Sequence, residues 1–518
     1  MSTLKFNYRK SIVLGILNIF SSIAFVSLAA VTKFLMDKAL NKNYEDLVFF
    51  IWLLFIVLLI GLILKIIQNF LKVKFIIKRE MELKKALFIS KLNADFYLNA
   101  NHTATTLQVY NMDINNIING ELEVIPMFFY QISRLVYASI LIVFFDWRLI
   151  LVFLCLGIIG IIFMQLYAKM IKPRHKKVLE SDDKLSIYVK EAWENLHLIR
   201  TYNAEDSFTM HYENKQQEAI NARNKKYNLQ LTASYLFLIG SNILYAGFIA
   251  YGGFAIYYQL LTYGTFLALM QLLGHIEGPI FSFSPLINKY TLMLSSRKRY
   301  LDQYSDVKLD QELLSDFDSI TFEDISFSYG SNKVIDNISF EINKKDIVQI
   351  KGDSGRGKTT LLALLLGLIK ANEGQIKIKY RNEFYDYDKV ASSLFAYVPQ
   401  INVLFSGTIK ENFELLTDAD DEQIKEALIV ANLDKEIIDL NQRLNENGKG
   451  LSVGQLQRLM IAIAYAKNRP IFLLDEFTSA LDKENSQIVI NNLLKTNKTI
   501  IYISHKNEEI IPNKVIEL

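Results

Sequence analysis

The stretch that decides the fold of this chain reads Gly352-Asp353-Ser354-Gly355-Arg356-Gly357-Lys358-Thr359-Thr360. Residues 346–351 before it have strand character, and a leucine-rich segment with helical character follows to about residue 370. Glycines let the backbone fold tightly around phosphate oxygens, and a helix N-terminus presents free amides to negative charge. This strand–loop–helix setting is that of a P-loop. It predicts that Lys358 reaches the β- and γ-phosphates of a nucleotide and that the Thr359 hydroxyl binds Mg²⁺.

Two more strand-like segments end in polar residues. Residues 470–474 lead into Asp475 and Glu476, and residues 499–504 lead into His505. Ligands of a nucleotide-binding α/β sheet bind at the carboxyl ends of its strands. We therefore expect Asp475 to bind magnesium, Glu476 to polarise an attacking water and His505 to lie at the same edge. Each residue alone would more often be an ordinary surface residue, so the prediction rests on their combination with the P-loop.

The N-terminal half of the 518-residue chain contains nearly all of its long apolar runs. Crossing about 30 Å of hydrocarbon takes roughly 20 mostly apolar helical residues. Six segments are long enough, namely residues 11–36, 47–71, 123–146, 148–171, 232–259 and 263–289. Only Asp146, Trp147 and Arg148 separate the third segment from the fourth, which predicts a tight hairpin. The alternative of six buried helices in a soluble core is disfavoured, because residues 53–64 and 151–164 are apolar on all faces.

Lysine and arginine gather in the loops after the second and fourth segments, and they are few in the other connections. Because the basic side of a membrane protein is cytoplasmic, we expect a multi-pass protein with both termini and the soluble domain in the cytoplasm. The two basic loops span about 50 and 60 residues with helical periodicity, which indicates that the membrane helices continue beyond the bilayer. An extension of about 25 residues would reach roughly 35–40 Å.

The predicted fold class is a multidomain membrane protein, in which a six-helix α-helical transmembrane domain precedes an α/β P-loop NTPase domain. We place these domains at residues 1–306 and 318–518, with a linker at 307–317. A net charge of +3 is too small to indicate a nucleic acid partner. The single cysteine, Cys155, excludes disulfides, a zinc site and an iron–sulfur cluster built from the cysteines of one chain.

Between the P-loop and Asp475 the chain resembles the ATPase domains of ABC transporters. The segment that looks like their signature motif is Leu451-Ser452-Val453-Gly454-Gln455-Leu456-Gln457-Arg458. Residues 396–400 resemble the Q-loop, 405–409 its usual continuation in exporters, and 479–482 the D-loop. Tyr329 is similar to the adenine-stacking aromatic residue of the family, and His505 to its switch histidine. The membrane half resembles exporter-type (type IV) half-transporters, including residues 199–205 in the second cytoplasmic loop.

The resemblance implies that two ATPase domains sandwich two ATP molecules. Each ATP would be held by the Lys358 loop of one chain and by Ser452, Gly454 and Gln455 of the other, so a working unit needs two chains. The family usually has glycine where this chain has Val453, and a β-branched residue restricts the local backbone. Either the site tolerates valine in a homodimer, or the chain pairs with a different half-transporter. A homodimer is favoured because the catalytic residues are present.

The resemblance also implies a role for single residues. Glu476 would be the catalytic base, His505 would contact the γ-phosphate, and Gln400 would connect Mg²⁺ to the membrane domain. The residues assigned to ATP are Tyr329, Gly352, Asp353, Ser354, Gly355, Arg356, Gly357, Lys358, Thr359, Thr360, Gln400 and Asp475. The implied Mg²⁺ ligands are Thr359, Gln400 and Asp475.

Ionisable side chains inside a bilayer cost about 2.5–3.5 kcal/mol each on insertion scales, so they usually face a cavity. The candidates are Arg134 in the third apolar segment and Gln271, His275 and Glu277 in the sixth. Glu277 and Arg134 are the best candidates for contact with a polar or charged cargo. The alternative is a structural role, in which they pair with each other or lie near the cytoplasm. An unwound segment at Gly278-Pro279 would free backbone groups that are tolerated only beside protein or water.

The implied function is ATP-driven export of an amphipathic peptide, drug or lipid across the bacterial plasma membrane. A dimer would achieve this by alternating access, with ATP and Mg²⁺ as cofactors and membrane lipid as a further partner. Two alternatives stay open, namely an importer of a small cargo on the same architecture and a nucleotide-gated channel or regulatory subunit. Glu476 disfavours the second alternative, because such proteins usually lack the catalytic acid.

Overall fold

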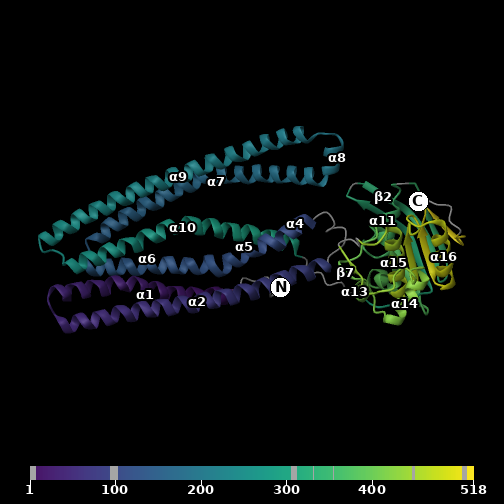
Figure 1. The fold of residues 1–518 in the computed structure, drawn as a ribbon, viewed down its shortest axis with the longest axis horizontal. Coiled ribbons are helices and arrows are strands. Elements are labelled where there is room, and N and C mark those ends of the chain that lie inside the picture. The colour runs from purple at the N-terminus through teal and green to yellow at the C-terminus, as the bar shows by residue number, and fades with distance from the viewer. Residues whose placement is uncertain are drawn as a thin grey trace. The chain divides into compact units, whose positions relative to one another are not determined.

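The computed structural model describes residues 8–93, 103–304, 312–330, 332–353, 355–445, 450–504 and 510–518 (Figure 1). Two predicted site residues, Ser354 and His505, and part of the predicted linker lie outside these ranges. The contacts within the chain divide it into two compact units. The N-terminal unit comprises Met1–Phe88 and Ala104–Tyr304, and the C-terminal unit comprises Ile89–Thr103 and Ser305–Leu518.

The N-terminal unit consists of long helices. Their bounds are α1 Tyr8–Leu40, α2 Tyr44–Leu92, α4 Thr103–Gln108, η3 Val109–Asp113, α5 Ile114–Asn119, η4 Gly120–Val124, α6 Ile125–Phe145, α7 Leu149–Glu194, α8 Leu196–Thr201, α9 Glu205–Tyr257 and α10 Tyr263–Gln303. Each predicted apolar segment falls within one of these helices or within about two residues of its ends, and the hairpin at residues 146–148 is confirmed. The segments η3 and η4 are π-helical turns within one helical run from α4 to α6.

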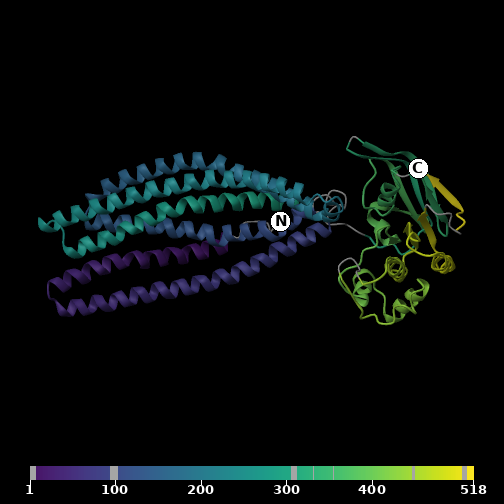
Figure 2. The ribbon, with the colours of Figure 1, turned by 45° about the horizontal axis from the view of Figure 1, so that its top comes forward.

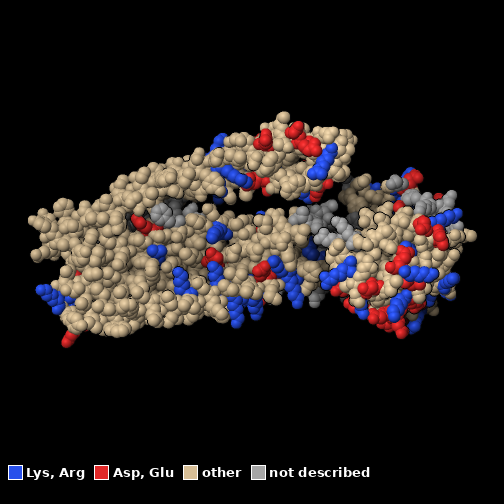
Figure 3. Space-filling model, viewed as in Figure 1, with Lys and Arg blue, Asp and Glu red and all other residues tan. Residues whose placement is uncertain are grey.

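The helices continue well past the predicted spans, as expected. The predicted second span ends at residue 71, yet α2 runs on to Leu92, and α7 and α9 extend similarly toward α8. Among the described residues, five helical runs are long and apolar enough to cross a membrane. The side chains of residues 149–161, which form the apolar start of α7, lie outside the described set. Figure 3 shows few charged side chains on the face of the helical unit where the predicted spans lie.

The helices of this unit pack in three groups. In both ribbon views α6 and α10 lie between the α1–α2 hairpin and the α7–α9 pair (Figure 2). Small side chains at the centre, Ala29 of α1, Ala138 of α6 and Ala268 of α10, are fully buried and let the three helices approach closely. Within α10 the helix continues through Gly278-Pro279 and Pro285, so this segment is not unwound. Proline removes one amide donor, but packing against α1 and α6 keeps the flanking turns helical.

Each π-helical turn places a buried carboxylate opposite an arginine. Glu121 in η4 accepts a hydrogen bond from Arg79 Nε of α2 at 3.0 Å, and both side chains are at most 4% exposed. Asp113 in η3 binds Arg299 of α10 through both carboxylate oxygens, at 2.5 and 2.8 Å. A π-helical turn shifts the following residues around the helix axis. These turns therefore orient two acids toward neighbouring helices at the end of the unit that contains the helical extensions.

The C-terminal unit is an α/β domain. Its strands are β1 Ser319–Tyr329, β2 Asn332–Asn343, β3 Ile347–Lys351, β4 Glu373–Tyr380, β5 Glu383–Asp386, β6 Phe395–Val398, β7 Gly407–Thr408, β8 Arg443–Leu444, β9 Ile471–Asp475, β10 Thr499–Ile503 and β11 Lys514–Glu517. Its helices are α11 Lys358–Leu365, α12 Tyr387–Leu394, α13 Ile409–Leu416, α14 Asp421–Val430, α15 Val453–Ala466 and α16 Lys483–Lys495. The predicted α/β class of this half is confirmed.

Two sheets organise this domain. One is antiparallel with strand order β2-β1-β4-β5, and the other is parallel with order β11-β3-β10-β9-β6. Every residue of β9 and β10 is buried, because hydrophobic clusters cover both faces of the parallel sheet. Such continuous apolar runs are typical of parallel strands that are covered on both sides.

The buried pair between Arg79 and Glu121 supports a stability prediction. Glu121→Ala should lower the melting temperature of the detergent-purified protein by about 5 °C or more, because a buried charge left alone costs about 3–5 kcal/mol. The double variant Arg79→Met/Glu121→Met should recover most of this loss, since no charge then stays buried. Glu180→Ala is the matched control, because its pair with Lys176 is 58–80% exposed and should contribute almost nothing. A Glu121→Ala melting temperature equal to that of the control would contradict the assignment.

Candidate functional site

The parallel sheet brings the predicted nucleotide residues to one edge. Ile503 of β10 is in register with both Ile350 of β3 and Asp475 of β9, and Val398 of β6 pairs with Leu474. The four strands are parallel, so their carboxyl ends meet at the same edge. The P-loop follows β3, Glu476 follows β9, and Gln400 lies two residues after β6. Strand β10 also ends at this edge, although His505 itself lies outside the described residues.

The P-loop has the backbone that its glycines allow. Gly355 and Gly357 have φ values of 84° and 94°, in the left-handed region that favours glycine. Gly357 precedes Lys358, the first residue of α11. The Lys358 ammonium donates a hydrogen bond to the Gly352 carbonyl at 2.8 Å, so it lies across the start of the loop. The first amides of α11 lack acceptors within the helix, which makes this turn suited to a phosphate.

Tyr329 lies on the hairpin next to this loop. It pairs with Asn332 across the β1–β2 turn, and the residue is 39% exposed, with its ring beside that of Phe327. Two residues further on, the Val334 carbonyl would lie 3.0 Å from a methyl group added at Gly357. The hairpin and the P-loop are therefore in close contact, which is the placement expected of an aromatic residue that stacks on a base.

A cleft of about 700 Å³ adjoins the P-loop. Its lining includes Gly352, Asp353, Lys358 and Ser504. A second cleft of about 700 Å³ lies between β4, β5 and the start of α12, and it contains none of the predicted site residues. Volume alone therefore does not distinguish the predicted nucleotide site, whereas the residues around it do.

Asp475 and Glu476 differ in burial and in backbone geometry. Asp475 ends β9 and is 8% exposed. Burial, together with the charge of Asp475, raises the pKa of Tyr397 to about 12, which keeps this neighbouring phenol neutral. Glu476 is half-buried, with φ of 47°, and its amide donates to the Ile503 carbonyl at 3.0 Å. A left-handed backbone costs a residue other than glycine about 1–3 kcal/mol, so the surrounding contacts hold Glu476 in place.

Gln457 makes contacts with this strained turn that sequence reasoning missed. Its side chain is 1% exposed in α15, and its amide nitrogen donates to the Glu476 carbonyl at 3.1 Å. Its amide oxygen accepts from the Ala480 amide at 3.0 Å. Gln457 thus closes the loop from Glu476 to Ala480. The sequence offered one signal for these contacts, a glutamine among the apolar residues of this helix. A buried side-chain amide requires hydrogen-bond partners.

The residues of the predicted signature motif begin α15. Ser452 caps this helix in a capping box with Gln455, at 3.2 and 3.0 Å. Val453 is the first helical residue and is 70% exposed, so neither its backbone conformation nor its surroundings require glycine. Its side chain changes only the surface at the helix start. Gly454 is more constrained, because an added methyl group would lie 3.2 Å from the Ala480 carbonyl.

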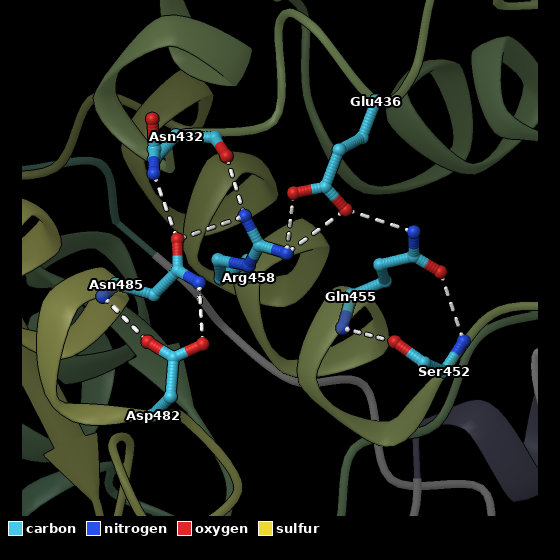
Figure 4. A network of polar contacts seen from close by, with 7 residues as sticks. All are labelled: Asn432, Glu436, Ser452, Gln455, Arg458, Asp482 and Asn485. Carbon is cyan, nitrogen blue, oxygen red and sulfur yellow. Dashed lines mark hydrogen bonds and ion pairs between the residues drawn. The ribbon is translucent and has the colours of Figure 1, made fainter.

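Arg458 is the centre of a polar network that fixes the start of α15 (Figure 4). Its guanidinium binds Glu436 at 2.8 Å, the Asn432 carbonyl and the Asn485 side chain. Glu436 also accepts from Gln455 at 2.8 Å. Burial alone would raise the pKa of Glu436, but the hydrogen bonds from Gln455 and Arg458 outweigh it and lower this pKa below its ordinary value. The carboxylate therefore stays charged and holds the capping box in place.

The polar candidates of the membrane half separate into two groups. Arg134 of α6 donates from Nε to His275 Nδ1 of α10 at 2.9 Å and from Nη2 to the Gly274 carbonyl at 2.9 Å. Glu277 instead accepts a hydrogen bond from the Ser241 hydroxyl of α9 at 2.9 Å. Gln271 is exposed one turn before His275. Within the described residues Arg134 and Glu277 therefore do not pair with each other.

The sequence matches two family models. Residues 11–280 match the ABC transporter transmembrane region, and residues 335–479 match the model described as ABC transporter. The chain belongs to the ABC transporter family. The match to the first model alone covers more than half of the chain. This ABC transporter chain is an ATPase coupled to transport, and its predicted class, a membrane domain fused to an ABC ATPase domain, is confirmed.

Individual relatives agree with an exporter-type architecture. The ABC transporter chain is 25% identical to a Rickettsia bellii protein named as an export ATP-binding/permease protein, over 96% of this chain and 90% of the relative. It is 27% identical to an ATP-dependent lipid A-core flippase of Desulfotalea psychrophila, over 94% and 88% of the two chains. A solved bacterial Atm1-family ABC exporter with ATP bound matches 99% of this chain and 94% of its own, with a TM-score of 0.84 and 21% identity. That last similarity shows the fold.

The contacts of Gln457 predict a specific kinetic effect. Gln457→Leu should lower kcat for ATP hydrolysis about tenfold or more with little change in KM, because losing hydrogen bonds worth about 1–3 kcal/mol releases the Glu476 turn while the P-loop stays intact. Gln457→Glu should retain part of the activity, since it keeps an acceptor for the Ala480 amide. The exposed Gln487→Ala on α16 serves as the control. A rise in KM at constant kcat would instead assign Gln457 a role in nucleotide binding.

Proposed function

We propose that two copies of this chain form an exporter that moves an amphipathic peptide, drug or lipid outward across the bacterial plasma membrane. The observation that carries the proposal is that one chain combines a P-loop, with Asp475 and Glu476 at the same sheet edge, and helices that extend far beyond the predicted spans. The names of the relatives, an export permease and a lipid A-core flippase, support outward movement. The relatives do not agree on one cargo.

The P-loop would hold the nucleotide through its backbone and one lysine. The amides at the start of α11 and the Lys358 ammonium would bind the β- and γ-phosphates, while Tyr329 would stack on adenine. Thr359, Gln400 and Asp475 would supply a hydroxyl, an amide oxygen and a carboxylate to Mg²⁺. These are the hard oxygen ligands that magnesium prefers, and phosphate oxygens would complete its shell. Bound Mg²⁺ would neutralise charge on the phosphates.

Hydrolysis would then depend on Glu476 and on a second chain. Glu476 would orient the attacking water and accept its proton, and His505 would contact the γ-phosphate. Ser452, Gly454 and Gln455 of the partner would close over the same phosphate. A single chain contains one P-loop and one signature motif, so an ATP site that needs a P-loop from one chain and a signature motif from the other forms only when two chains pair. In a homodimer, both ATP sites are complete.

Exposed apolar side chains support pairing. Trp193 at the end of α7 and Tyr202 just after α8 are each 77% exposed. They lie at the tip of the long α7–α9 pair, far from the predicted spans. Large aromatic residues at such a tip are suited to contact another domain. We propose that this tip contacts the partner chain in the dimer.

The charge distribution supports the orientation of the chain. The basic loops lie at the end of the N-terminal unit that contains the helical extensions, opposite the short α6–α7 and α9–α10 connections. By the positive-inside preference, both termini and the ATPase domain would be cytoplasmic. The importer alternative uses the same orientation, so it differs only in the direction of cargo movement.

The proposal is tested by hydrolysis in proteoliposomes. Glu476→Gln should still bind Mg–ATP but lose at least about 100-fold in turnover, because general-base catalysis contributes roughly 10²–10⁴-fold. Lys358→Ala should lose nucleotide binding itself. Glu484→Gln, an exposed acid at the start of α16, is the matched control and should behave like the unmodified protein. Unchanged turnover in Glu476→Gln would rule out the assigned role.

A transport assay separates export from import. In right-side-out vesicles, an exporter should move labelled amphiphile out of the vesicles, whereas an importer should move it in.

A further inference from the structure

We propose that Arg134, positioned by His275, forms a binding site for an anionic group, a carboxylate or a phosphate, on an amphipathic cargo. This inference rests on the proposed function, because it requires that α6 and α10 line the route of a transported molecule. It goes beyond that proposal by naming the chemistry of the cargo.

The pair lies near the middle of the predicted membrane spans. Arg134 is about three helical turns from Phe145, and His275 is about three turns from Tyr263. Both of those helix ends belong to the short connections at the same end of the unit. Three turns amount to about 16 Å, roughly half of a 30 Å hydrocarbon layer. A guanidinium at this depth cannot reach either interface.

Arg134 is held by neutral partners. Because its Nε donates to His275 Nδ1, that nitrogen must be the acceptor, and the imidazole is the neutral tautomer with its proton on Nε2. The Gly274 carbonyl is also uncharged. Among the residues that the structure describes, no carboxylate forms an ion pair with Arg134, and the nearby Glu277 is bound to Ser241 on another helix. The positive charge is therefore positioned but not neutralised.

Two other arginines of this unit provide the contrast. Arg79 and Arg299 each bind a buried carboxylate, Glu121 and Asp113 respectively. Those two pairs lie in the helical extensions and are explained by packing. Arg134 has the same capacity for two parallel hydrogen bonds and lacks the acid that would use it. A planar anion from outside the chain would complete the arrangement.

Glycines on α10 provide the space around the guanidinium. A methyl group added at Gly278 would lie 2.6 Å from Arg134 Nη1, so only glycine lets the guanidinium lie this close to the helix. One turn away, a methyl group at Gly274 would meet nothing within 4 Å. Gln271 follows on the same face and is exposed. The half-buried arginine therefore borders open space beside an amide side chain, and charge at this depth is tolerated where water or a ligand meets it.

The experiment measures binding of matched amphiphiles to the full-length dimer in nanodiscs of neutral lipid. The probes share one oleoyl chain, namely oleoyl lysophosphatidate, oleate and uncharged monooleoylglycerol, and inorganic phosphate tests whether a free anion is enough. The unmodified protein should bind the two anionic amphiphiles at least tenfold more tightly than monooleoylglycerol. If the protein binds inorganic phosphate but binds the anionic amphiphiles no more tightly than monooleoylglycerol, the cargo assignment is wrong.

Variants assign this preference to the site. Arg134→Gln should weaken binding of both anionic amphiphiles about tenfold or more and leave monooleoylglycerol unchanged, whereas Arg134→Lys should retain part of the preference because it keeps the charge. Gly278→Ala should weaken the same two probes by displacing the guanidinium while preserving every charged group. Lys298→Gln, an exposed cation on α10, is the matched control and should change nothing.

Two results separate this inference from the proposed function. If Arg134→Gln and Gly278→Ala bind the anionic amphiphiles as tightly as the unmodified protein does, the site assignment is wrong, whatever the ATPase activity. Basal ATP hydrolysis without amphiphile, measured in parallel, reports on the proposed function alone. Intact basal hydrolysis without any preference for anionic probes would therefore reject the Arg134 site and retain the pump.

Discussion

In the proposed function, the rest of this molecule depends on one interaction, the contact between a triphosphate and the start of α11. Backbone amides and the Lys358 ammonium would hold the phosphates, and the loop has room for them because Gly355 and Gly357 adopt left-handed conformations between β3 and the helix. The parallel sheet then fixes what surrounds the phosphates, because β9 and β6 end at the same edge. Asp475 and Gln400 lie at that edge because their strands are in register, and no contact between the two side chains is needed to place them there.

A second constraint connects this edge to the surface that a partner chain would use. Gln457 lies one turn after the Ser452 cap of α15, yet its amide binds the backbone of Glu476 and Ala480. Gly454 packs against the Ala480 carbonyl from the same helix. Any displacement at the start of α15 therefore acts directly on the turn that holds Glu476. In a dimer this would link the phosphate of one site to the acid of the other.

Strong local signals made most of the fold predictable. Uninterrupted apolar runs predicted the membrane helices, and the glycine-rich turn before Lys358 predicted the edge of the sheet at which the site lies. Both signals depend only on residues that are neighbours in the chain. Contacts between distant residues could not be predicted this way. The partners of Gln457 are backbone atoms about 20 residues away, and no side chain marks them. That Arg134 meets His275 rather than Glu277 depends on how α6 and α10 pack, and the placement of His505 stays a prediction.

The central claim is that two chains enclose ATP between the P-loop of one and the start of α15 of the other. Paired cysteines test it most directly, in the variant Arg356→Cys/Val453→Cys with Cys155→Ser and Glu476→Gln. Under mild oxidation we predict a covalent dimer that forms on addition of Mg–ATP and is absent without nucleotide or with either new cysteine alone. Chains that stay monomeric with ATP, or that cross-link equally without it, would contradict the account.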